Sequence, residues 1–266
     1  MLSKLLKHEM RACSRLLLPL YLVLVVFTIL DRIIIRLNIF EGITGIIPVL
    51  ITFLYVMSII AIVIVSFVIV ILRFYKNLIA DEGYLMFTLP VKTRQLIDSK
   101  LIVSTLWTLI SILITLASIF VVMVTPERFQ HLKEAFAALM QQLQDEFGAY
   151  SALLIIEIIV LFFLVLLNAI LHIYASIGIG QLVNGHKIIG SFAAFVVLYI
   201  ASQVIGVLFI LICDIISVRS GFSGMQSPYK TVVFALLPAL MVYLLAFDIA
   251  FYQTTHILFK RKLNLE

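Results

Sequence analysis

The feature that most constrains this chain is the apolar run Ile46–Leu72, which contains no Asp, Glu, Lys, Arg or His. A helix needs about 20 apolar residues to cross a hydrocarbon core. At a rise of about 1.5 Å per residue the run is about 40 Å long, so it should tilt or project beyond the core. The run therefore predicts a membrane-spanning helix.

Five more stretches are long and apolar enough to be spans. The chain is 64% hydrophobic and only 12% charged over 266 residues, which is more apolar than one soluble core can use. We therefore predict an all-α polytopic membrane protein with a single transmembrane domain over residues 1–266. Its six expected spans are Leu16–Leu37, Ile46–Leu72, Leu101–Val124, Ser151–Ile179, Ile188–Cys213 and Thr231–Leu258.

The distribution of positive charge predicts the orientation. With the N-terminus inside, about two thirds of the 19 Lys and Arg residues fall on the cytoplasmic side, as the positive-inside rule requires. Both termini are then cytoplasmic, and the net charge of +5 reflects membrane topology rather than nucleic-acid binding. Cys13 and Cys213 would lie near opposite membrane faces, which excludes a disulfide between them.

The first residues resemble a signal peptide, but Asp31-Arg32 stands where a small-residue cleavage site should be. We therefore expect an uncleaved first span. Residues 1–14 place apolar side chains on one helical face and basic ones on the other. This pattern predicts an interfacial helix with its apolar face in the acyl boundary and its basic face toward anionic headgroups.

The outer loop, residues 125–148, should also be helical. Thr125 is a good N-cap, Pro126 suits the first turn, and Gly148 can end the helix. Its apolar side chains recur every three or four residues, so the helix should lie on the outer membrane surface or pack against other outer segments; a binding role is the less favoured alternative. These side chains are Phe129, Leu132, Phe136, Leu139, Leu143 and Phe147.

The cytoplasmic loop, residues 73–100, is polar at both ends and strongly apolar at its centre, YLMFTLP. An exposed apolar patch of this kind indicates a contact surface, either for another protein or, as an alternative, for the bilayer. The stretch FYKNLIADEGYLMFTLPVKTRQLIDSKL resembles the loop between the second and third spans of ABC-2-type transporter permease subunits, particularly the small Firmicutes-type ones. The second inner loop, GQLVNGHKIIGS, is also similar to that group.

The resemblance implies that the first inner loop carries a coupling helix that docks on a separate ABC ATPase subunit. Tyr84, Met86 and Phe87 are the expected anchors, because aromatic and Met side chains dominate buried contact energy. In many ABC-2-type exporters the longer outer segment lies between spans five and six. Here the longer outer segment lies between spans three and four, so the chain departs from the family pattern. The expected docking residues are Asp81, Glu82, Gly83, Tyr84, Leu85, Met86, Phe87, Thr88 and Leu89.

No G-x-x-x-x-G-K-[ST] motif occurs in the chain, so ATP and Mg²⁺ would bind the partner ATPase and this chain would bind no cofactor. Six spans are few to enclose a transport path, which predicts a dimer with a second permease copy or a paralogue. The resemblance places the protein in a bacterial plasma membrane, exporting or expelling an amphipathic, peptide or drug-like substrate.

Glu157 and Asp248 fall inside expected spans, where an ionised side chain costs about 2.5–3.5 kcal/mol on insertion scales. Each either lines a substrate path or gate, pairs with a neighbouring polar group, or is protonated. Asn168 and His172 favour helix–helix hydrogen bonds, and no catalytic or metal-ligating constellation is recognisable. The alternatives to a permease are a non-transporting anchor or sensor subunit and, less favoured, an intramembrane enzyme.

Overall fold

The computed structural model describes residues 2–37, 46–78, 92–183, 185–219 and 232–261. Six helices in these ranges are long and apolar enough to cross a membrane, and no described residue lies in a strand. The prediction of an all-α, multi-pass membrane protein is therefore confirmed. The chain divides into two compact units, residues 1–132 and 133–266. The expected single transmembrane domain stays a prediction.

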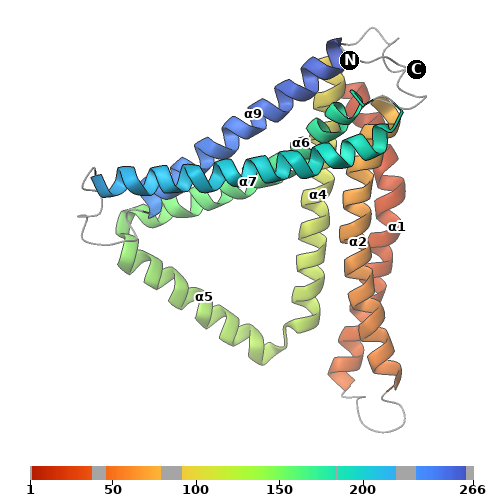
Figure 1. Cartoon of the computed structure of the whole chain (residues 1–266). Coiled ribbons are helices and arrows are strands. Elements are labelled where there is room, and N and C mark those ends of the chain that lie inside the picture. The colour runs from red at the N-terminus through yellow and green to blue at the C-terminus, as the bar shows by residue number, and fades with distance from the viewer. Residues whose placement is uncertain (1, 38–45, 79–91, 184, 220–231, 262–266) are drawn as a thin grey trace. The chain divides into compact units, whose positions relative to one another are not determined.

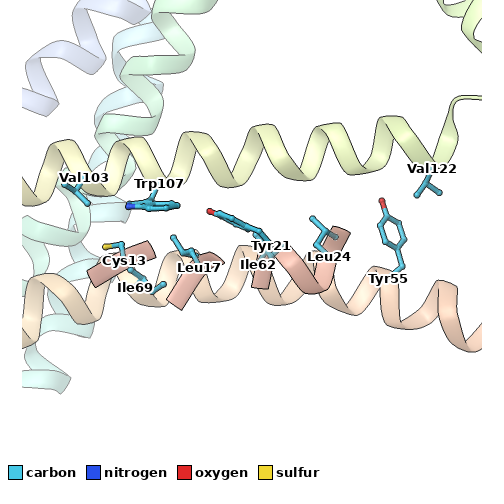
Figure 2. Packing of buried hydrophobic residues seen from close by; sticks show 10 residues of the cluster. All are labelled: Cys13, Leu17, Tyr21, Leu24, Tyr55, Ile62, Ile69, Val103, Trp107 and Val122. Carbon is cyan, nitrogen blue, oxygen red and sulfur yellow. The ribbon is translucent and has the colours of Figure 1, made fainter. Parts of the chain in front are cut away.

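The first unit is built on three long helices (Figure 1): α1 Leu2–Leu37, α2 Ile46–Leu78 and α4 Thr93–Met123. All three pack on one another, because each contributes one face of buried side chains. Along α1 the buried residues recur every three or four positions, the spacing of a single helix face. Figure 2 shows the resulting core, made by Cys13, Leu17, Tyr21 and Leu24 of α1, Tyr55, Ile62 and Ile69 of α2, and Val103, Trp107 and Val122 of α4.

The N-terminal segment differs from the prediction of a separate interfacial helix. α1 is one unbroken helix, about 54 Å long, whereas a hydrocarbon core is about 30 Å thick. The expected lipid-facing side chains instead pack within the unit, since Cys13 is buried and Leu6 and Met10 contact the same core. The physical reason is Glu9, which lies on this face, is buried, and pairs with cations of α2 and α4.

α2 and α4 both extend past their expected spans toward the loop that joins them. α2 continues from the predicted end at Leu72 to Leu78, and α4 begins at Thr93 rather than Leu101. The helices therefore carry the loop about 9–12 Å beyond the apolar stretches. Residues 79–91, which include all nine expected docking residues, lie outside the described part of the chain.

The helix expected over residues 125–148 is confirmed, and its place on the outer side stays a prediction. α5 spans Pro126–Phe147, and the backbone N–H of Arg128 donates to Thr125 Oγ1 at 3.3 Å, the expected N-cap contact. Gly148 has φ +55°, a left-handed conformation that ends the helix without the cost of a Cβ. A 3₁₀ turn, Gly148–Tyr150, then leads into α6.

The second unit contains α6 Ser151–Gly180, α7 Lys187–Arg219, a π-helical turn η4 Val232–Leu236 and α9 Leu237–Arg261. α6 is the central element, packing against both α7 and α9. The chain turns tightly between α6 and α7. This turn leaves no room for a side chain at position 180, because a Cβ on Gly180 would lie 2.3 Å from the backbone nitrogen of Ser191. Glycine is required there for close packing.

Candidate functional site at the base of the α2–α4 loop

A buried ion cluster joins the three helices of the first unit at the end that carries the N-terminus. Glu9 of α1 is 4% exposed and accepts two charge-assisted hydrogen bonds. Arg73 Nη2 of α2 donates to Glu9 Oε2 at 2.7 Å, and Lys100 Nζ of α4 donates to Glu9 Oε1 at 2.8 Å. One carboxylate thus connects two helices to a third.

The cluster is held by charge rather than by apolar packing. Lys100 is 3% exposed, whereas the Arg73 side chain keeps 21% of its surface accessible. Removing a charge from water costs several kcal/mol per ion, so Lys100 depends on the Glu9 carboxylate far more than Arg73 does. The three groups together carry one net positive charge when all are ionised.

The position of the cluster defines what it can do. Arg73 lies five residues, about 8 Å, before the end of α2 at Leu78, and Lys100 lies about 10 Å after the start of α4 at Thr93. The cluster therefore fixes both helices that hold the loop, close to where the loop leaves them. A force applied to that loop would reach α1 through Glu9.

A line of buried hydroxyl groups continues along the interior of the unit. Tyr21 Oη and Ser66 Oγ both lie within hydrogen-bond distance of Ser111 Oγ, at 2.6 and 2.9 Å. Thr28 Oγ1 lies 2.7 Å from Ser118 Oγ about two turns further along α1. Hydrogen bonds of this kind in membrane bundles are worth about 0.6 kcal/mol each, so they align the three helices more than they stabilise them.

The structure gives Asp248 a pairing role in the second unit. It is 7% exposed, and its Oδ1 accepts a hydrogen bond from Asn168 Nδ2 at 2.8 Å, which links α9 to α6. Its Oδ2 is buried and has no hydrogen-bond partner among the described residues. Asn168 therefore acts as the helix–helix contact expected from the sequence.

Glu157 lies in the first turns of α6, about 16 Å along the helix from Asn168, so the structure does not bring Glu157 and Asp248 together. Its Oε2 is buried without a hydrogen-bond partner in the described ranges. His172 Nε2 donates to the carbonyl of Phe195 at 3.1 Å, and its ring packs 5.2 Å from that of Phe251. His172 is thus a structural contact between α6 and its neighbours.

Within the described residues, no group of three or more His, Cys, Asp or Glu side chains could hold a metal ion. Sequence reasoning counted Arg73 and Lys100 as loop charges and left Glu9 unassigned. A signal was present, because Glu9, Cys13 and Leu17 are spaced by four and share the buried face of α1. A carboxylate on that face could have been recognised as needing a buried cation.

No protein-family model matches this chain, and searches of curated proteins and of solved structures found no match either. The resemblance to ABC-2-type permeases therefore rests on the loop sequences given above.

Proposed function

We propose that this chain is the permease subunit of an ATP-binding cassette transporter, and that it exports an amphipathic, peptide or drug-like substrate. The ATPase would be a separate polypeptide that binds the loop between α2 and α4. A second permease copy or a paralogue would complete the transport path. In this proposal both termini are cytoplasmic and the membrane is a bacterial plasma membrane.

The observation that supports the proposal is the Glu9–Arg73–Lys100 cluster beneath the loop. A loop that only rests on the bilayer needs no rigid support, whereas a loop that transmits force does. Here the two helices that flank the loop are tied to α1 within about 10 Å of it. The apolar, aromatic centre of the loop sequence supplies the kind of side chains that anchor protein–protein contacts.

The proposed mechanism is mechanical. ATP binding would close two ATPase subunits, and the docked loops would move with them. Because α2 and α4 are joined to α1 by ion pairs, the first unit would follow as one body rather than bend at the loop. The transporter would then alternate between states that open to opposite sides of the membrane.

The test is co-purification of the tagged, full-length protein from its native membranes. We expect a P-loop ATPase to co-purify in stoichiometric amount, and Phe87→Asp to abolish its binding because a charge would enter the apolar contact. Phe136→Asp is the matched control, since Phe136 lies on α5 and is 61% exposed. An unchanged ATPase yield with Phe87→Asp would rule out the docking assignment.

Substrate-stimulated ATP hydrolysis of the reconstituted pair separates a permease from the alternative of an anchor or sensor subunit. A complex that forms but shows no stimulation by any amphipathic substrate would favour the anchor.

A further inference from the structure

A cavity of about 450 Å³ lies in the first unit, at the end opposite the Glu9 cluster. Its volume is within the range of about 300–1,000 Å³ that is usual for small-molecule sites. All three long helices and the first turn of α5 contribute to it. The lining residues are Asp31 and Ile35 of α1, Val49, Thr52, Tyr55 and Val56 of α2, Val122 and Met123 of α4, and Arg128 of α5.

The floor of the cavity carries a buried carboxylate. Asp31 is 1% exposed, and its Oδ1 accepts a hydrogen bond from Thr52 Oγ1 at 2.6 Å. None of the ion pairs among the described residues involves Asp31. An ionised carboxylate has about four acceptor sites, and Thr52 fills one of them, so Asp31 can accept further hydrogen bonds. Asp31 therefore offers a site for a cation or a strong donor.

The rim of the cavity carries the opposite charge. Arg128 is exposed, and its Nη1 donates to the carbonyl of Met123 at 3.2 Å, which holds the guanidinium beside the end of α4. A guanidinium has five N–H donors, so this one bond leaves donors for an anionic group such as phosphate. The cavity thus combines an acid at its floor with a cation at its mouth.

The apolar residues that line the cavity place the side chains of Asp31 and Arg128 next to lipid. Val49 and Met123 line the cavity and are 65% and 58% exposed. In a membrane protein such apolar surfaces face acyl chains. Because α4 ends at Met123 and α5 begins at Pro126, the cavity lies at the end of the span, where headgroups begin.

We propose that this cavity binds the headgroup of a zwitterionic phospholipid that carries a primary ammonium group. The ammonium binds Asp31, the phosphate binds Arg128, and the acyl chains lie along Val49 and Met123. A primary ammonium donates three hydrogen bonds, whereas the quaternary ammonium of a choline lipid donates none. The cavity therefore selects ethanolamine over choline headgroups. This site does not depend on the proposed transport function.

The experiment measures lipid binding to the purified full-length protein by native mass spectrometry, with phosphatidylethanolamine and phosphatidylcholine of identical chains. We expect the ethanolamine lipid to bind at least about tenfold more tightly, the effect of one hydrogen bond to a charged group. Asp31→Asn should remove the preference, while its Oδ1 still accepts from Thr52 and preserves the fold. Equal binding of the two lipids by the unaltered protein overturns the proposal.

Arg128→Gln tests the proposed phosphate contact. Because Arg128 is exposed, its replacement should leave the fold intact. Because both lipids carry phosphate, this variant should weaken both about equally, whereas Lys133→Gln, an exposed control on α5, should weaken neither. Dodecylamine carries a primary ammonium and an alkyl chain but no phosphate, so it tests whether the phosphate contributes to binding. If dodecylamine binds as tightly as the ethanolamine lipid, or if Arg128→Gln changes nothing, the phosphate has no role and the headgroup assignment is wrong.

Discussion

Replacing Glu9 by Gln should loosen the first unit at the end that supports the α2–α4 loop. Gln is nearly the same size, so the change removes charge rather than volume. It leaves Lys100, which is 3% exposed, and Arg73 without the carboxylate that now lies 2.7–2.8 Å from both. The new amide N–H groups would also face one of these donors.

The expected cost follows from the burial of the two cations. Breaking a buried ion pair by removing one partner costs about 3–5 kcal/mol. Arg73 can regain water through its 21% exposed surface, whereas Lys100 cannot, so we expect a value near the lower end, about 3 kcal/mol. The midpoint temperature at which α1 separates from α2 and α4 on heating should fall by about 6–12 °C.

The chain supplies its own probe for this measurement. Cys13 is 4% exposed and lies one turn from Glu9 on α1, so its thiol should react only when α1 separates from its neighbours. In a Cys213→Ser background it is the only cysteine, and a fluorogenic maleimide reports its exposure during heating. Glu127→Gln, on exposed α5, is the matched control and should leave the midpoint unchanged.

A second variant tests the electrostatic reasoning itself. Adding Lys100→Met to Glu9→Gln removes the buried charge of Lys100 together with the carboxylate of Glu9, and such apolar replacements of buried pairs are often close to neutral. The double variant should therefore recover most of the lost midpoint. If Glu9→Gln behaves like the control, or if the double variant is worse than the single one, the cluster does not hold the helices together.

Two further predictions concern the second unit. Gly180→Ala should lower the thermal midpoint, because its Cβ would overlap the backbone of Ser191 and overpacking costs about 1–3 kcal/mol; Gly185→Ala, with open space around its Cβ but φ +88°, separates steric overlap from backbone strain. Asp248→Asn should change stability little, because Oδ1 still accepts from Asn168 and an uncharged amide nitrogen takes the place of Oδ2, which has no partner among the described residues. If Asp248→Asn instead abolishes transport while the protein stays folded, Asp248 has a functional role beyond pairing.

The sequence alone was sufficient for the elements whose signals are local. Spans follow from the lengths of apolar stretches, and α5 follows from its N-cap, its first-turn proline and its terminal glycine, all of which act within a few residues. The helix–helix role of Asn168 was also predictable, because a polar side chain in lipid must find a partner on a neighbouring helix. Local chemistry decides these features wherever the helices are placed.

The tertiary structure decided which charges meet. Residues 1–14 have an amphipathic pattern that suits a membrane surface equally well, and only the packing of α1 on α2 and α4 shows that Glu9 is buried between two cations. Asp31 appeared in the sequence only as a charge in place of a cleavage site, whereas in the fold it is buried and lines a cavity. The physical reason is that an ion pair or a cavity is made by side chains from separate helices, and the apolar spacing of each helix states which face is buried but not which residue it will meet.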